Sequence, residues 1–338
     1  MLTPGYGAAQ GYASNTAYAA SVAPYAARGD FADWAYSLAG TQSSPGQSLL
    51  PTNVGMSSQF AEDTVYTNKG FSGYNGLLVT LHKNAGAGLT FDINYTWSHS
   101  IDNVSVNANT IAYGGYGFIC DVVRPRECRG NSDFDVTNYI NGYVTYDLPY
   151  GHGKVFGSTS PWIVNELLGG WSVSALPGWH TGFPYFAGSN AFVAGFANDA
   201  PAILAGNKSD LKIHLNGGKG SPLYAYANPT QALSDYTGPV GFEVGSRNNL
   251  RGPRSTTLDA GLSKTFPVTK GTVFKLRGDA FNVMNHPVFN NPTTANSDIT
   301  QSSAPFGVIT TDGITNTSGP NFGEGGARVL QVSLRIEF

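Results

Sequence analysis

The chain has 338 residues, with 19 basic and 22 acidic side chains and a net charge of −3 at pH 7. This weak net charge gives no reason to expect a nucleic-acid partner. Charged residues make up only 12% of the chain, about half the fraction usual in soluble proteins. Low charge with abundant Gly, Tyr and Phe is typical of a β-protein whose outside meets lipid. The same composition also suits a secreted β-rich adhesin.

The first part of the chain, residues 1–73, is rich in Ala, Gly, Ser and Tyr, and we interpret it as a surface loop or lead-in. Its start lacks the basic and apolar segments of a signal peptide. No apolar run in the chain approaches the ~18 residues that a membrane-spanning helix needs. A chain of this kind that crosses a membrane must therefore do so as a closed β-barrel.

The second part, residues 74–338, contains segments in which apolar and polar residues alternate, as in strands with two different faces. The clearest is 89–99, where Phe91 and Ile93 share one face and Asp92 and Asn94 the other. The alternation predicts about seven strands, at residues 75–83, 89–99, 134–148, 171–179, 258–266, 274–280 and 330–338. The alternative is a self-contained eight-stranded barrel with an eighth strand at residues 58–67, although the alternation there is poor.

The predicted apolar faces point outward to lipid, and the polar faces point inward. The inward charged residues predicted to face a lumen are Asp92, Asp259, Lys275, Arg277, Asp279 and Arg335. For the row Lys275, Arg277 and Asp279, with Asp259 on the preceding strand, there are two interpretations: it lines a path through the lumen, or, as we favour, it is a static ion-pair network that supports the wall. Lys264 is the one charge on an outward face, and it lies near a strand end, where it can reach the interface.

The connections between the predicted strands alternate in length. Residues 84–88 and 267–272 are tight turns, and 149–170 is intermediate, with a short helix predicted to have Ser160 as its cap and Pro161 at its first position. The long connections are 101–130, 181–253 and 286–327. Outer-membrane barrels have short turns on one side and long loops on the other. A soluble β-sandwich has no reason to sort its loops in this way.

Aromatic residues gather near the predicted strand ends, as they do at the two interfaces of a membrane. Those on the short-turn side are Tyr146, Tyr150, Trp171, Phe266, Phe274 and Phe338, and those on the long-loop side are Tyr95, Trp97, Trp179 and Phe183. Cys120 and Cys128 lie close together in a polar stretch. They predict a local disulfide in an oxidising compartment, with two unpaired thiols as the alternative.

From about residue 74 onward the chain contains a series of short motifs: YNGLLV at 74–79, GLTF at 88–91, YTWS at 95–98, SDFDVT at 132–137, YDLPYG at 146–151, LGGW at 168–171, GFP at 182–184, RGP at 251–253 and FNVMNHP at 281–287. In these motifs the chain resembles the C-terminal barrel of TonB-dependent receptors, in particular the Oar-like group. The resemblance covers roughly three quarters of the chain. Each motif is loose, and their order and spacing together are specific.

The resemblance implies a location in the bacterial outer membrane and a ligand-uptake role, with lipid, the barrel-assembly machinery and the TonB system as partners. The assembly machinery is expected to recognise the aromatic C-terminus, formed by Leu330, Val332, Leu334, Ile336 and Phe338. Members of the family also carry a signal peptide, a plug domain and about 22 strands. Seven strands are too few to close a bacterial barrel. We therefore expect the sequence to be a C-terminal fragment that forms an incomplete barrel.

No catalytic, metal or cofactor motif stands out, and we expect neither an enzyme nor a bound cofactor. Three functions are weighed. The first is the wall and ligand-binding loops of an outer-membrane receptor. The second is a non-transporting secreted or surface adhesin, suggested by the Ala/Tyr/Gly-rich opening and the long polar loops. The third, an outer-membrane enzyme, has no residue pattern in its favour, and the transported ligand cannot be read from the sequence.

Overall fold

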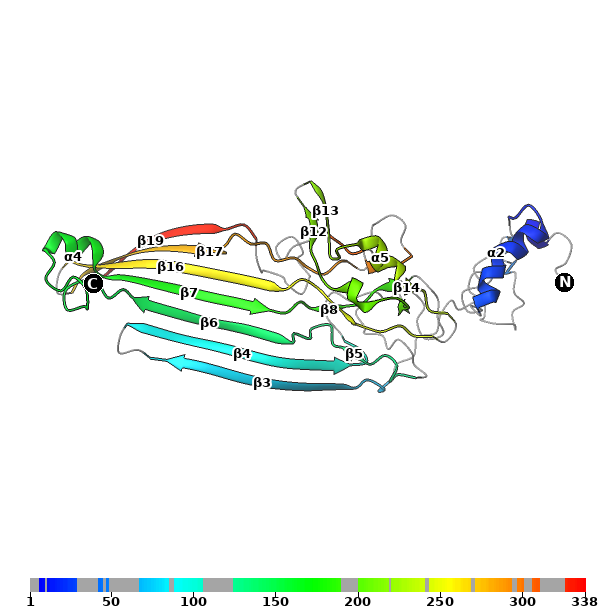
Figure 1. The fold of residues 1–338 in the computed structure, drawn as a ribbon, viewed down its shortest axis with the longest axis horizontal. Helices are drawn as coiled ribbons and strands as arrows, with labels where there is room; N and C mark the ends of the chain where they lie inside the picture. Colours follow the sequence, from blue (N-terminus) through cyan, green and yellow to red (C-terminus); the bar gives the residue numbers. More distant parts are fainter. Residues whose placement is uncertain are drawn as a thin grey trace.

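The computed structural model describes residues 6–9, 11–28, 42–44, 47–48, 67–84, 88–105, 124–189, 200–218, 220–240, 243–268, 271–293, 297–300, 306–310 and 326–338. Its main feature is one antiparallel sheet of seven long strands in the order β19-β17-β16-β7-β6-β4-β3, with the short strand β5 (Gly130–Asn131) beside β4 (Figure 1). We call the seven long strands the wall. They are β3 (Ser72–Lys83), β4 (Leu89–Asp102), β6 (Asn138–Asp147), β7 (Trp171–His180), β16 (Ser255–Pro267), β17 (Val273–Phe281) and β19 (Val329–Glu337).

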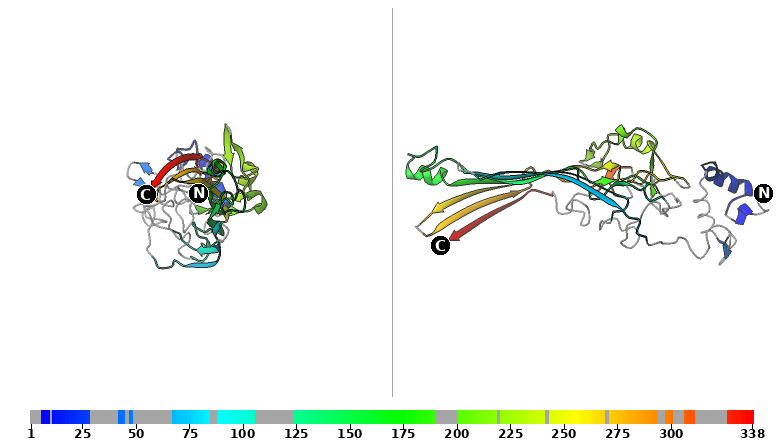
Figure 2. Two further views of the ribbon diagram at one scale, coloured as in Figure 1. Left: turned by 90° about the vertical axis from the view of Figure 1, so that its left-hand side faces the viewer. Right: turned by 90° about the horizontal axis from the view of Figure 1, so that it is seen from below.

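The wall strands have nine to fourteen residues each, compared with about 9–11 needed for a tilted strand to cross a bilayer. Viewed along the strands, the sheet is an open arc (Figure 2). In the described part of the chain β3 and β19 are its two edges. The prediction of an all-β, incomplete barrel of about seven strands is confirmed. Residues 58–66, most of the alternative eighth strand, lie outside the described residues.

One predicted strand boundary was wrong. The strand predicted at residues 134–148 begins only at Asn138. Phe134 and Val136, predicted to face lipid, lie before it, in a turn in which the Asp135 amide donates to the Ser132 carbonyl at 2.9 Å. Side-chain hydrogen bonds, and not strand pairing, hold this turn to the end of the neighbouring strand β4. For example, the Ser98 hydroxyl donates to the Val136 carbonyl at 2.7 Å.

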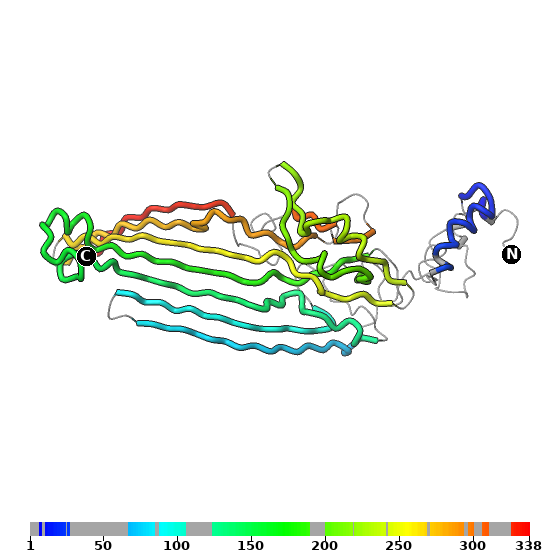
Figure 3. Tube along the Cα trace, in the orientation of Figure 1, coloured from blue at the N-terminus to red at the C-terminus, as the bar shows by residue number. Residues whose placement is uncertain are grey.

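The short connections all lie at one end of the wall and the long ones at the other, as the chain trace shows (Figure 3). At the short-turn end, the connection between β6 and β7 holds the helix α4 (Trp162–Leu168). Its N-cap is Pro161, and no side chain caps it, so the predicted cap at Ser160 was wrong. The Ser160 hydroxyl instead lies 3.1 Å from the Tyr150 hydroxyl, within hydrogen-bond distance.

At the other end, the long connections fold into a second body, which we call the loop platform: the described parts of residues 181–254 and 286–310. Its elements are β8 (Pro184–Tyr185), β9 (Gly188–Ser189), β10 (Ala200–Pro201), β11 (Ile203–Leu204), η1 (Lys208–Leu211), β12 (Asn216–Gly218), β13 (Ser221–Tyr224), α5 (Pro229–Ser234), β14 (Tyr236–Thr237), β15 (Leu250–Arg251) and β18 (Val308–Ile309). It has its own apolar core, which includes Tyr226, Ala232 and Phe306. The wall has no such core, because each of its faces meets the surroundings directly.

Within residues 1–73 the structure describes α1 (Tyr6–Ala9), α2 (Asn15–Arg28) and the strand pair β1 (Gln42–Ser44) and β2 (Gln47–Ser48). The division of the chain at residue 73 stays a prediction. Among the helices that the structure describes, none has both the length and the apolar character to cross a membrane.

Candidate functional site: the faces of the wall and the loop platform

The strand registers bring the apolar rows of all seven wall strands onto one face. Residues directly opposite in an antiparallel pair share a face, and the pairs include Val79 with Tyr95, Tyr95 with Ile140, and Leu276 with Leu334. The face includes Leu77, Val79, Leu81, Phe91, Ile93, Tyr95, Trp97, Ile140, Val144, Tyr146, Trp171, Val173, Ala175, Trp179, Leu258, Ala260, Leu262, Lys264, Phe266, Phe274, Leu276, Leu330, Val332, Leu334 and Ile336. We call it the apolar face.

Much of the apolar face is uncovered, with Leu77, Leu262, Leu330, Val332 and Leu334 among the exposed large side chains. A continuous apolar surface of this extent is rare on a protein in water and marks contact with an apolar partner. Four of the five predicted assembly-signal residues lie on this face of the edge strand β19, and Phe338 follows the strand and is 96% exposed.

The six predicted lumen residues all lie on the opposite, polar face. Within it, Lys275 and Arg335 are directly opposite each other, an arrangement of like charges that destabilises a sheet. Glu337 relieves it, because its carboxylate lies 2.8 Å from the Lys275 ammonium and 3.3 Å from the Arg335 guanidinium. The Arg277 guanidinium pairs with the Asp279 carboxylate at 2.8 Å.

Asp92 and Asp259 also have partners on the polar face. The Asp92 carboxylate is 3.2 Å from the His82 ring and accepts a hydrogen bond from Asn94 at 2.9 Å. The Asp259 carboxylate accepts the Asn282 amide at 2.8 Å. These contacts favour the static-network interpretation of the row, while its exposure to a lumen stays a prediction. The face also carries apolar side chains, Leu78, Tyr139, Tyr143 and Leu176, which the alternation did not indicate.

A cavity of about 120 Å³ lies on the polar face across β7, β16 and β17. Its lining includes Asp259, Arg277 and Asp279, together with Ser174 and Gly261. A Cβ at Gly261 would lie 2.6 Å from both the Asp279 carboxylate and the Ser174 hydroxyl. Because Gly261 has no side chain, the Arg277–Asp279 ion pair has room to lie at this position.

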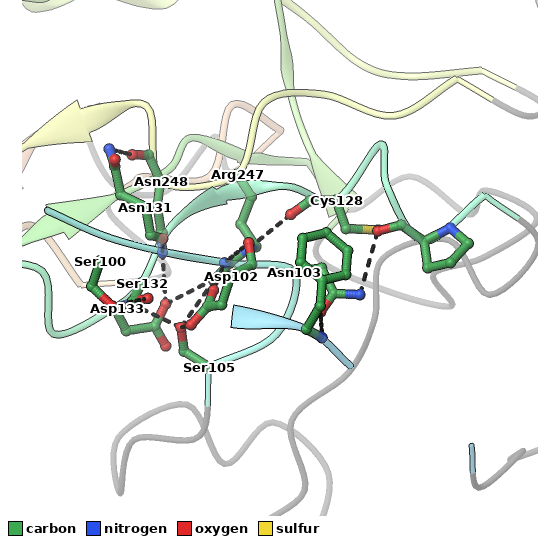
Figure 4. A network of polar contacts seen from close by, with 12 residues as sticks. Ser100, Asp102, Asn103, Ser105, Cys128, Asn131, Ser132, Asp133, Arg247 and Asn248 are labelled. Atoms are coloured by element: carbon green, nitrogen blue, oxygen red, sulfur yellow. Dashed lines mark hydrogen bonds and ion pairs between the residues drawn. The ribbon is translucent and has the colours of Figure 1, made fainter. Parts of the chain in front are cut away.

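The loop platform is joined to the wall by a buried arginine, Arg247, which is only 9% exposed (Figure 4). Its guanidinium donates to the Asp102 carboxylate and carbonyl at the end of β4 and to the Asp133 carboxylate. It also donates to the Cys128 carbonyl at 3.2 Å and to the Ser105 hydroxyl at 3.3 Å. All five contacts reach residues at least 114 positions away in the sequence. The Arg247 side chain therefore binds the long connection after β7 to the long connection after β4.

The next residue, Asn248, extends the same junction. Its side chain donates to the Asn131 carbonyl at 2.7 Å and to the Asp133 carboxylate at 2.6 Å, and the Asn131 side chain donates back to its carbonyl at 2.8 Å (Figure 4). Asn248 has a φ of 53°, in the left-handed region that Asn tolerates better than most residues. The side chains of Arg247 and Asn248 share one partner, the Asp133 carboxylate.

A second arginine, Arg251 in β15, lies four residues further along the chain and makes a similar set of contacts. It donates to the carboxylate of Asp135, which is 1% exposed, to the Asp135 carbonyl at 2.7 Å and to the Gly182 carbonyl at 3.3 Å. The same carboxylate accepts the Ser100 amide at 2.6 Å and lies 3.6 Å from the His99 ring. Buried charges of this kind are stable only when they are paired and hydrogen-bonded, as these are.

Cys128 is disulfide-bonded and fully buried, and its carbonyl is one of the Arg247 acceptors. Cys120, its predicted partner, lies outside the described residues. The disulfide therefore lies directly beside the junction between the wall and the loop platform.

The platform core contains three tyrosines that are kept neutral. Burial raises the pKa of Tyr236 to about 12 and raises the pKa values of Tyr185 and Tyr226 further. The hydroxyls of Tyr185 and Tyr226 lie 2.5 Å apart, and the Tyr226 ring stacks on Phe306. This core gives the platform a fixed shape that isolated loops would lack.

Sequence reasoning did not single out Arg247 or the role of Arg251, although Arg251 lies in the RGP segment. The available signal was the presence of two arginines in the long connection 181–253 and of Asp133 and Asp135 at the start of the predicted strand 134–148, and nothing in the spacing paired them. Lys264 was expected to reach outward, and it is instead 3% exposed and bound beneath α4. Within the described ranges no three His, Cys, Asp or Glu residues gather as a metal site.

The comparisons with known proteins agree with this geometry. The chain matches the family described as "Outer membrane beta barrel domain" over residues 2–331, a range that includes most of both parts of the chain. No curated protein and no solved structure matches the chain. Because the family match covers nearly the whole chain, the protein belongs to the outer membrane beta barrel domain family and is located in the bacterial outer membrane.

Proposed function

We propose that this chain forms wall strands and the extracellular ligand-binding loops of a TonB-dependent receptor of the Oar-like kind. The observation that carries the proposal is the loop platform, which stands at only one end of the wall and has its own core. Arg247 and Arg251 lock it to the strand ends. A folded, fixed surface at the mouth is what a receptor needs, since a preorganised site binds with less loss of entropy. The resemblance of the strand motifs to this receptor group supports the same proposal.

The parts have separate roles in this proposal. The apolar face meets lipid, the polar face lines the interior, and the platform presents the ligand-binding surface outside the cell. Gating and contact with the TonB system belong to the plug and TonB-interacting segments of such receptors. The barrel-assembly machinery would recognise the exposed edge strand β19 and Phe338. We propose no enzymatic step and no bound cofactor.

Orientation is tested by labelling intact cells with a membrane-impermeant maleimide. We expect Thr230→Cys, on the exposed side of the platform helix α5, to react in intact cells. The matched variant Lys154→Cys, exposed at the short-turn end, is expected to react only after the outer membrane is permeabilised. The reverse pattern would place the platform in the periplasm and end the receptor proposal.

Energised uptake is tested by genetics in the source bacterium. Strains that lack this gene, or that lack TonB, are compared for growth on a panel of carbon, peptide and glycan sources. We expect every source whose use depends on this gene to depend on TonB as well. Uptake that requires the gene and persists without TonB would instead indicate a passive pore, and an effect on surface attachment alone would favour the adhesin.

A further inference from the structure

The helix α4 at the short-turn end exposes large apolar side chains. Trp162 is 72% exposed and Leu167 is 65% exposed, and Ile163 and Leu168 are also exposed. Ile163 and Leu167 are four residues apart, so they lie on the same side of the helix, one turn from each other. The apolar side of α4 therefore has no partner among the described residues.

The opposite side of α4 is held by polar contacts. The Asn165 side chain accepts the His152 amide at 2.8 Å, which ties the helix to the preceding turn. The Gly169 amide closes the helix by donating to the Asn165 carbonyl at 2.8 Å. The contact between His152 and Asn165 therefore holds this side of the helix towards the protein.

Lys264 attaches the C-terminal end of α4 to the apolar face of the wall. Its ammonium donates to the Leu167 carbonyl at 3.4 Å and to the Gly169 carbonyl, and it lies 5.1 Å from the Trp171 ring centroid and 4.8 Å from that of Phe266. A cation beside the last carbonyls of a helix stabilises them. The Trp171 indole also donates to the Leu167 carbonyl at 3.0 Å.

We propose that α4 is an interfacial anchor that binds the phospholipid surface of the periplasmic leaflet of the outer membrane. Trp171, Lys264 and Phe266 belong to the apolar face, so the exposed side of α4 continues a surface that meets lipid. Short turns of outer-membrane barrels lie on the periplasmic side. Trp and other amphipathic residues collect at this level of a membrane, and helices with one apolar side lie in its plane.

The neighbouring residues favour lipid over a protein partner. Val155 and Phe156, in the connection between β6 and β7, and Val268, in the connection between β16 and β17, are also exposed apolar residues. Exposed apolar side chains spread over several connections at one end of the wall suit a lipid surface. Within α4, Glu166 is the only charged residue, and it is partly buried.

The test uses the full chain in isolated outer-membrane fragments that are open on both sides. A nitrobenzoxadiazole fluorophore is attached to Ile163→Cys, to Thr230→Cys in the platform helix α5, and to Leu334→Cys on the apolar face. The unsubstituted chain serves as the labelling control. Each sample is then quenched with nitroxide-bearing phospholipid and, separately, with aqueous iodide.

We expect the probe at position 163 to behave like the probe at 334: a blue-shifted emission, severalfold stronger quenching by nitroxide lipid than at 230, and protection from iodide. Lipid quenching at 334 together with iodide quenching at 163 equal to that at 230 would overturn the anchor while leaving the wall in the membrane. Loss of lipid quenching at 334 itself would overturn the wall assignment and the anchor with it.

The role of Lys264 is tested in the same samples by Lys264→Met, which keeps the apolar stem and removes the charge. We expect the nitroxide quenching at position 163 to fall severalfold while the quenching at 334 stays unchanged. Unchanged quenching at both positions would show that Lys264 does not hold the helix against the membrane.

Discussion

The wall and the loop platform are stabilised by opposite arrangements of polar groups. In the wall, polar and apolar side chains alternate along each strand, and nearly every charge stays partly exposed on the polar face. In the platform and its junction, charged groups such as Asp135 and Arg247 are buried and paired with particular opposite charges. The wall therefore tolerates substitutions that keep polar residues on the polar face and apolar residues on the apolar face. The junction depends instead on particular ion pairs.

The largest effect is expected at the junction. Arg247→Met leaves the Asp102 and Asp133 carboxylates without their positively charged partner, and an uncompensated buried charge costs about 3–5 kcal/mol. We expect rapid proteolysis and hydrogen exchange throughout residues 181–254 with little change in the wall strands. The control is Arg254→Met, an exposed arginine nearby, which should behave as the unsubstituted chain. Equal protection of the platform in both variants would show that the junction does not hold it.

A somewhat smaller effect is expected on the apolar face. Leu334→Arg places a charge in the lipid-facing row, at a cost of about 2–4 kcal/mol near the bilayer midplane, and should block membrane assembly. Ser333→Arg, on the polar face opposite Arg277, should assemble, with only the cost of a like-charge pair, about 0.2–1 kcal/mol. The fraction of protein in outer membranes measures both. Equal assembly of the two variants would invalidate the assignment of the faces.

High pH should affect the platform and spare the wall. The pKa of Tyr236 rises from 10.0 to about 12 because the side chain is buried. The full contribution of Tyr236 to stability is present below pH 10, where its side chain is neutral in both the folded and the unfolded state. This contribution is lost as the pH rises from 10 towards 12. The loss is about 1.4 kcal/mol for each unit in this window. Hydrogen exchange at pH 9 and 11, chosen as roughly one unit either side of the ordinary tyrosine value, measures it, and platform protection that is independent of pH would contradict the assignment.

The smallest effect is expected inside the platform core. Tyr226→Phe removes the hydroxyl that lies 2.5 Å from that of Tyr185 while keeping the ring stacked on Phe306. A net loss of about 1 kcal/mol is usual for one buried hydrogen bond. Thermal unfolding followed by platform-specific labelling at Thr230→Cys would detect it. A loss as large as that of Arg247→Met would mean that the core, and not the junction, controls the order of the platform.

The contrast also explains which parts the sequence predicted. Alternation with period two is a local property, so the strands at β4, β16 and β19, their faces and the sorted connections could be inferred residue by residue. The junction is a set of contacts between residues more than a hundred positions apart, such as Arg247 with Asp102, and no local pattern encodes such a pairing. Lys264 was placed on the correct face, but its burial depends on α4, which a neighbouring connection supplies.

The measurement that tests the wall most directly is a spin-label scan of residues 90–97 of β4 in the outer membrane, using lipid-soluble oxygen and a water-soluble nickel complex. We expect oxygen access to peak at Phe91, Ile93 and Tyr95 and nickel access to peak at the positions between them, including Asp92 and Asn94. Equal access of both reagents along consecutive residues would contradict a wall with one face in lipid.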